Sequence, residues 1–369
     1  MKITKVEAFP VPPRWVFCKV DTDEGIAGWG ECTLEGHAAT QVAAVSELAR
    51  ILVGEDPARI EFLWQSMYRA GFYRGGPVLM SALSGVDMAL WDIFGKMQGL
   101  PAYKLLGGAC RTKVRVYGGC GGNDPAEIRE SARACVERGF TAMKFCPVDA
   151  TETVDGLDVL KKAEARVAAA REGAGDADIG LDFHGRIAPP VAIALADVLT
   201  PLRPFFIEEP VQCENVDALL DVKRSTSIPI ATGERLYGRH GFREVIEKRA
   251  AAILQPDLAH AGGLTEVKKI AAMADAHYMA IAPHCPLGPV ALAACVHFAL
   301  STPNFLIQEH GSLGEGYLKA PLTVKNGHVF LPDAPGLSIE VDERAVRAMP
   351  WKDWDTPRLF HEDGSVADW

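Results

Sequence analysis

The 369-residue chain lacks the features that mark several large classes of protein. It has 38 Lys and Arg against 48 Asp and Glu, so it has no basic surplus with which to hold nucleic acid or an anionic membrane. Its nine cysteines occur singly, without CxxC or CxxxC spacing, which argues against a disulfide scaffold or a cysteine zinc site. We therefore expect a cytoplasmic protein with reduced thiols that binds neither nucleic acid nor membrane.

Long uninterrupted apolar segments are also missing. No signal peptide is visible after Lys2 and Lys5, where three prolines follow instead of an apolar run. Residues 278–308 contain no Asp, Glu, Lys or Arg, but four prolines interrupt them, and the apolar core 290–300 is too short to cross a bilayer. This stretch is better explained as a buried strand followed by a buried helix.

Two common catalytic signatures are absent as well. A dinucleotide-binding enzyme would carry GxGxxG between a strand and a helix, and the glycine run 118–122 has the wrong spacing. A dinuclear barrel hydrolase would want His-x-His on its first strand, and residues 114–122 contain no histidine. Neither class is favoured.

What the chain does contain is a series of short apolar segments that each end in a polar side chain. The intervals between these polar ends are 26, 26, 23, 27 and 25 residues, enough for one strand, one helix and two short loops. In a (β/α) barrel the active site lies at the carboxyl ends of the strands. The pattern therefore predicts such a barrel, with these residues at its mouth: Asp182, Glu208, Glu234, Asp257, His284 and Glu309.

Two further parts are expected around the barrel. Residues 1–112 combine a three-stranded meander with three helices and form an α+β capping domain. The βα rhythm occupies residues 113–317 and provides eight strands. The tail, residues 318–369, is expected to return to the N-terminal unit. The predicted fold is thus α/β, a modified TIM-type barrel with an N-terminal α+β cap.

Three carboxylates, those of Asp182, Glu208 and Glu234, end three consecutive strands. Neighbouring strands in a barrel lie about 5 Å apart, so the three side chains converge and repel one another. A divalent cation resolves this repulsion, and an all-oxygen ligand set favours Mg²⁺ over Zn²⁺. We expect one Mg²⁺ per subunit. The spacing alone does not choose between Glu208 and Glu209, and ion pairs with Arg186 or Arg235 are the structural alternative.

Histidines accompany these carboxylates. Asp257 and His284 end successive strands, and an Asp beside a His sets the tautomer and the basicity of the imidazole. His184 lies two residues after Asp182, which on a strand puts both on the same side. The two histidines therefore flank the metal, so that one can take a proton while the other gives one. A non-catalytic acid-binding module would not need both. His297, on an apolar helix, is expected to be a core residue.

The same residues carry a family resemblance. The order of acidic and histidine residues at the strand ends, behind an α+β cap, is similar to the mandelate racemase branch of the enolase superfamily. Within that branch the chain resembles the acid-sugar dehydratases, most clearly in residues 67–77, 182–186, 255–258, 260–263 and 283–289.

The resemblance implies a Mg²⁺-dependent dehydration that yields a 2-keto-3-deoxy acid. In such a reaction the metal holds the substrate carboxylate, and His284, oriented by Asp257, removes the C2 proton. His184 protonates the departing 3-hydroxyl, and Glu309 hydrogen-bonds a carboxylate oxygen. The family pattern also selects Glu208 over Glu209 as the ligand.

Two features depart from the wider family. Racemases and cycloisomerases of the superfamily carry Lys-x-Lys at the end of the second strand. Here residues 144–146 read Lys-Phe-Cys, which weighs against a racemase or epimerase. The segment after Glu309 and the tail are shorter than expected, which leaves the identity of the aldonic or aldaric acid open.

Contacts to the substrate are less well defined. The segment 69–77 combines two arginines, two aromatic residues and three glycines, and is either a solvated turn or a lid over the barrel mouth. A small sugar acid is the expected partner, and family members commonly form even-numbered homo-oligomers. The candidate contact residues are Lys144, Arg186, Arg14, Tyr73 and Arg74.

Overall fold

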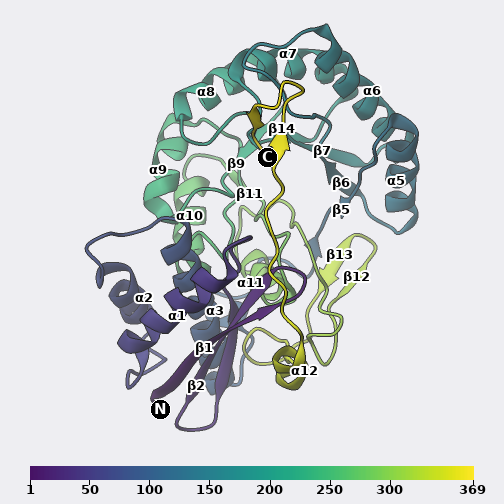
Figure 1. The fold of residues 1–369 in the computed structure, drawn as a ribbon. Helices are drawn as coiled ribbons and strands as arrows, with labels where there is room; N and C mark the ends of the chain where they lie inside the picture. The colour runs from purple at the N-terminus through teal and green to yellow at the C-terminus, as the bar shows by residue number, and fades with distance from the viewer.

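The first hundred residues form an antiparallel sheet covered by helices. In the computed structural model, which describes residues 1–369, this cap lies below the barrel in Figure 1. The strands follow one another in the sheet, as the predicted meander requires. The elements are β1 (Ile3–Val11), β2 (Trp15–Thr22), β3 (Ala27–Glu31), α1 (Ala38–Leu52), α2 (Ile60–Arg69), α3 (Pro77–Gln98) and the short α4 (Ala102–Leu105).

Helix α3 and strand β3 approach each other more closely than ordinary side chains permit. A Cβ atom added to Gly28 or Gly30 would overlap the backbone of α3, at Ala89 and Gly85 respectively. The glycines therefore let the helix lie directly on the sheet. Helix α3 is long and apolar enough to cross a membrane, but 78% of its most apolar window is buried inside the molecule, as in a core helix.

Seven parallel strands form one continuous sheet that curves into the barrel, and helices arch around its outside (Figure 1). The strands are β5 (Gly118–Gly119), β6 (Ala142–Phe145), β7 (Asp178–Asp182), β8 (Phe206–Glu208), β9 (Ile230–Thr232), β10 (Ile253–Leu254) and β11 (Ala280–Ile281). The helices are α5 (Pro125–Glu137), α6 (Leu157–Ala174), α7 (Pro189–Leu199), α8 (Val216–Ser225), α9 (Gly238–Lys248), α10 (Gly263–Asp275) and α11 (Pro289–Leu300).

Residues 305–308 supply the eighth strand and close the barrel. Phe305 bridges in parallel to Ile281 of β11, and Gln308 bridges in parallel to Val116, just before β5. The backbone N–H of Leu306 donates to Ile281 at 2.8 Å. The predicted fold class is confirmed. The barrel interior is filled by a buried layer with one side chain from each of seven strand segments: Tyr117, Ala142, Phe206, Ala231, Ile253, Ala282 and Ile307.

The tail takes two directions. Its first part forms a hairpin, β12 (Thr323–Lys325) and β13 (His328–Phe330), that pairs with β4 (Val114–Arg115). Helix α12 (Glu343–Ala348) then lies against β1, where Arg347 contacts Glu7 at 3.0 Å. This part of the tail thus lies beside the cap. Residues 351–369 instead run on to the barrel and end in the hairpin β14 (Leu359–Phe360) and β15 (Val366–Ala367).

The close packing of β3 on α3 predicts that Gly30→Ala destabilises the protein. An added methyl group must push the helix away from the sheet, an overpacking effect of about 3 kcal/mol. Denaturant unfolding followed by tryptophan fluorescence measures it. Gly119→Ala is the matched control, because nothing lies within 4 Å of a Cβ atom at that position. Equal stability of the two variants would contradict the packing argument.

Candidate active site

The carboxylates of Asp182, Glu208 and Glu234 meet at the barrel mouth. Asp182 and Glu208 are direct neighbours in the parallel pairing of β7 with β8, and Glu234 follows β9 after Gly233. One oxygen from each of the three lies within 4.8 Å of the others. Asp182 and Glu208 are buried. The structure thus brings together the three oxygen ligands expected from the spacing.

Lys144, near the end of β6, forms ion pairs with two of these carboxylates and with Glu309. Its ammonium lies 3.0 Å from Asp182, 2.8 Å from Glu208 and 3.1 Å from Glu309. Burial lowers the pKa of Lys144, but the three carboxylates outweigh it and hold the pKa well above its ordinary value. Lys144 thus offsets part of the negative charge at the barrel mouth.

The single charge of Lys144 does not balance all the carboxylates at the barrel mouth, and the excess negative charge fits a divalent cation. Burial and the nearby charge on Asp182 hold the pKa of Glu208 well above its ordinary value. Burial, together with Glu209 and Asp182, raises the pKa of Glu234 to about 7. One buried oxygen of Glu234 has no hydrogen-bond partner. Three hard oxygen donors with an unsatisfied atom among them suit Mg²⁺.

Glu209 is turned away from this cluster. Strand β8 ends at Glu208, and Glu209 takes a left-handed backbone conformation with φ of 39°. Its carboxylate lies 2.7 Å from Arg235. Burial raises the pKa of Glu209 to about 7, against the opposing charge of Arg235. The ion pair with Arg235 that we considered for the metal ligands is thus formed by Glu209, the residue after Glu208.

His184 meets Asp182 through a turn and not along a strand. Strand β7 ends at Asp182, and His184 has φ of 52°, so the two-residue alternation that we expected does not operate here. The backbone N–H of His184 donates to Asp182 at 3.0 Å, and the imidazole Nε2 lies 3.4 Å from the same carboxylate. His184 and Asp182 do lie close together, but a turn brings them together and not the strand alternation on which the prediction was based.

The hydrogen bond from Arg186 determines the tautomer of His184. Arg186 Nη2 lies 3.2 Å from His184 Nδ1, and a guanidinium can only donate. Nδ1 must therefore accept, which puts the imidazole hydrogen on Nε2, the atom that faces Asp182. Burial, with help from the charges of Arg186 and Lys144, lowers the pKa of His184.

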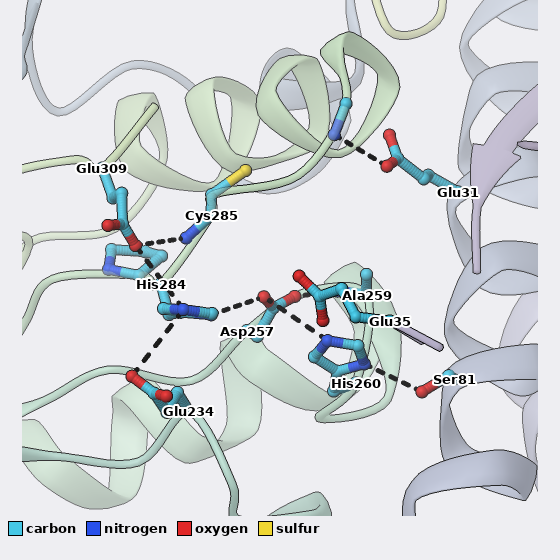
Figure 2. Close-up of polar contacts among 12 residues, drawn as sticks. Glu31, Glu35, Ser81, Glu234, Asp257, Ala259, His260, His284, Cys285 and Glu309 are labelled. Carbon is cyan, nitrogen blue, oxygen red and sulfur yellow. Dashed lines mark hydrogen bonds and ion pairs between the residues drawn. The ribbon is translucent and has the colours of Figure 1, made fainter. Parts of the chain in front are cut away.

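His284 lies on the other side of the cluster. Its Nδ1 is 2.8 Å from Asp257, while Nε2 is 3.7 Å from Glu234 and 3.8 Å from Glu309 (Figure 2). Burial lowers the pKa of His284, but the surrounding carboxylates outweigh it and hold the pKa well above its ordinary value. Nδ1 is engaged by Asp257, so Nε2 is the atom available for proton transfer.

Both oxygens of Glu309 face hydrogen-bond donors. One oxygen accepts the backbone N–H of Cys285 at 2.9 Å, and the other faces Lys144. Burial raises its pKa, but Lys144 and His284 outweigh that effect, so the pKa lies below its ordinary value. Glu309 therefore accepts hydrogen bonds as a carboxylate in this arrangement.

A contact from the cap to the His284–Asp257 pair was missed in the sequence. His260 lies 3.8 Å from Asp257, and its Nδ1 is 2.8 Å from Ser81 of α3 (Figure 2). Ser81 donates its own hydrogen to Pro77, so His260 Nδ1 donates to Ser81. The spacing Asp257-x-x-His260 was the available signal, but only the folded cap shows the partner.

Two of the five proposed substrate contacts, Tyr73 and Arg74, lie elsewhere, whereas Arg14 lines a hollow beside the site with Pro286 and His310. Tyr73 is 85% exposed. Together with Arg74 it borders a cavity between α1, α2 and α3, and none of the acidic or histidine residues of the site lines this cavity. Arg14 pairs with Glu35 at 3.5 Å and stacks on Trp354. Lys144 and Arg186 are the two that the structure brings to the cluster. A lid role for residues 69–77 stays a prediction.

Comparisons with known proteins agree with this geometry. Residues 11–107 match the mandelate racemase / muconate lactonizing enzyme N-terminal domain, and residues 127–345 match the enolase C-terminal domain-like family. D-galactonate dehydratases of Ralstonia pickettii and Pectobacterium atrosepticum are 47% and 46% identical, with both chains covered completely. A solved enolase from Agrobacterium radiobacter, described as a candidate galactarate dehydratase with Na and L-malate bound, is 34% identical over the whole of both chains, with a TM-score of 0.93.

The oxygen cluster predicts that Mg²⁺ stabilises the protein. Binding to the folded state alone adds about 2.7 kcal/mol at 100 times Kd, which raises Tm by several degrees. Thermal unfolding with Mg²⁺ and with EDTA measures this shift. Glu234→Gln should remove most of it, because the amide supplies a weaker ligand. Glu209→Gln is the control and should keep the shift. Loss of the shift in the control alone would reverse the ligand assignment.

Proposed function

Because this chain belongs to the mandelate racemase/muconate lactonizing enzyme family of the enolase superfamily, we infer that it is a hydro-lyase of acid sugars. We propose that it converts D-galactonate to 2-keto-3-deoxy-D-galactonate. The observation that carries this proposal is the pair of histidines, His184 and the Asp257-bound His284, on two sides of one carboxylate cluster. The relatives named for this reaction share 46–48% identity over their full length.

A resident metal forms part of the proposal. One Mg²⁺ per subunit would be held by Asp182, Glu208 and Glu234. When bound, it supplies positive charge that holds the substrate carboxylate and stabilises the negative charge developing there as the C2 proton leaves.

The side chains divide the remaining chemistry. Nε2 of His284 takes the C2 proton, while Asp257 holds Nδ1–H and keeps the ring in the required tautomer. Before this step His184 must carry a proton on both ring nitrogens, so that Nδ1 gives up the hydrogen bond from Arg186. Its Nε2 then delivers a proton to the 3-hydroxyl, so the C3–O bond breaks, water leaves and the imidazole ends neutral. The enol that remains tautomerises to the 2-keto-3-deoxy acid. Lys144 and Glu309 lie beside the cluster, where they can contact the substrate carboxylate.

The ion pairs of Lys144 disfavour a racemase or an epimerase. Such an enzyme of this family needs a lysine base at the end of the second barrel strand. Here the only lysine at that point is held as an ammonium by three carboxylates. Lys144 therefore does not supply a second base beside His284. His184 is instead placed to assist loss of the 3-hydroxyl.

Dehydration of another sugar acid is the second candidate function. The relatives align with this chain over 382 positions, against its 369 residues, so the relatives have segments that this chain lacks. A neighbour of similar fold is described as a candidate galactarate dehydratase. Gluconate, arabinonate and galactarate are the alternative substrates.

We also propose a cytoplasmic homo-oligomer that binds neither nucleic acid nor membrane. The net charge of −10 and the nine free cysteines support this assignment.

A keto-acid assay on a panel of C5 and C6 aldonic and aldaric acids tests the substrate. With Mg²⁺, D-galactonate should give a 2-keto-3-deoxy product, and EDTA or Asp182→Asn should abolish it. Turnover of only gluconate, arabinonate or galactarate would keep the mechanism and replace the substrate. Epimer formation without a ketone would refute the dehydratase assignment.

Replacing each histidine should affect a different step of the reaction. His284→Asn should lose both C2 proton exchange in deuterated water and keto-acid formation, by about 10² to 10⁴-fold. His184→Asn should lose keto-acid formation by a similar factor but keep C2 exchange, because the base is intact. Exchange that persists in His284→Asn would sink the base assignment. The exposed His240→Asn serves as control.

A further inference from the structure

The last part of the chain crosses from the cap to the barrel mouth. We call residues 351–369 the strap; in Figure 1 it is the yellow segment that climbs from α12 past the front of the molecule to β14. At the cap end, Trp354 lies under the guanidinium of Arg14, at 5.0 Å from the ring centre. At the barrel end, His361 contacts Glu152 at 3.2 Å. The strap is thus attached to both parts.

The hairpin of the strap places its final aromatic ring at the site. Leu359 of β14 pairs with Ala367 of β15, and Ala367 is buried. Asp368, next along the chain, borders a cavity together with Arg186 and Glu152. These contacts bring Trp369 to the loop that follows β7.

Trp369 stacks on His184. The ring centroids are 6.4 Å apart and the planes are inclined by only 7°. Asp182 and Arg186 contact the two ring nitrogens at the edge of the same imidazole. The edge and one face of His184 are therefore both held, each by a different part of the chain.

Ordinary core packing does not explain the position of Trp369. Its side chain is 48% exposed, and it belongs to none of the three apolar clusters of the protein. Two rings stacked within 7 Å attract each other by about 0.5–1.5 kcal/mol, enough to bias the orientation of a half-exposed imidazole. The stacked pair with His184 is thus a contact outside the apolar core.

We propose that Trp369 is a positioning residue for His184. Its indole lies parallel to the imidazole in an offset stack and, with Arg186, keeps Nε2 directed at the carboxylate cluster, where the 3-hydroxyl of the substrate must lie. The inference rests on the proposed role of His184 in dehydration. It assigns the strap a part in the elimination half of the reaction and none in proton abstraction by His284.

Kinetics of strap variants test this role. Trp369→Ala should lower keto-acid formation by about 10 to 100-fold, the effect of a misplaced catalytic group, and leave C2 proton exchange unchanged. Trp369→Phe should restore most of the activity, because a phenyl ring can still stack. Val366→Ala is the matched control, an apolar truncation on the same strap at an 81% exposed position, and should behave as the unaltered protein. Equal loss of exchange and dehydration in Trp369→Ala would overturn the proposal in favour of a purely structural role.

A second measurement needs no substrate. Diethylpyrocarbonate modifies exposed imidazoles, and peptide mass spectrometry gives the rate at His184 alone. Trp369→Ala should raise this rate several-fold over the unaltered protein and over Val366→Ala, because removal of the neighbouring indole opens access to the imidazole. An unchanged rate would overturn the stacking whatever the activity. An increased rate supports the stacking even if no sugar acid is dehydrated, so the two proposals fail separately.

Discussion

Mutual repulsion among carboxylates is the constraint on which the site depends. Asp182, Glu208, Glu234 and Glu309 converge because parallel strands end at the same face of the barrel. Two like charges 4 Å apart repel by about 4 kcal/mol at an effective dielectric constant of 20. Several such pairs would exceed the 5–15 kcal/mol by which a typical domain is stable. Lys144 offsets part of this repulsion.

The same repulsion explains how the site can be both stable and reactive. A cation bound among the carboxylates lowers their energy and attracts an anionic substrate in one step. His284 lies among the carboxylates of Asp257, Glu234 and Glu309, whereas His184 lies between Asp182 and Arg186. The two imidazoles thus have different electrostatic surroundings because their neighbours differ.

The cap supports the site from behind. Glu31 of β3 accepts the backbone N–H groups of Gly288 and Ala291 at the start of α11, directly after the loop that carries His284. Trp64 of α2 donates to the carbonyl of Gly262, beyond Asp257. These buried polar contacts would each be costly to leave unmade, so they fix the cap on the barrel. The strap adds a further connection between the cap and the barrel.

The sequence by itself determined the barrel and the identity of its polar strand ends. Strand spacing and apolar runs are local properties, and a regular fold converts them directly into a common face. Residues such as Asp257 and His284 could therefore be paired before any coordinates were known. Even so, the strand alternation invoked for His184 does not hold, because a left-handed turn lies outside what a period of two describes.

Only the tertiary structure decided which residues far apart in sequence support those strand ends. Ser81 beside His260, Glu31 beneath α11 and Trp369 on His184 are contacts between elements with no fixed spacing along the chain. The segment 69–77, which contains Tyr73 and Arg74, has a composition suited to anion binding, yet both residues lie beside helices of the cap. Composition shows what a side chain can do; where it lies depends on how the cap, the barrel and the strap pack together.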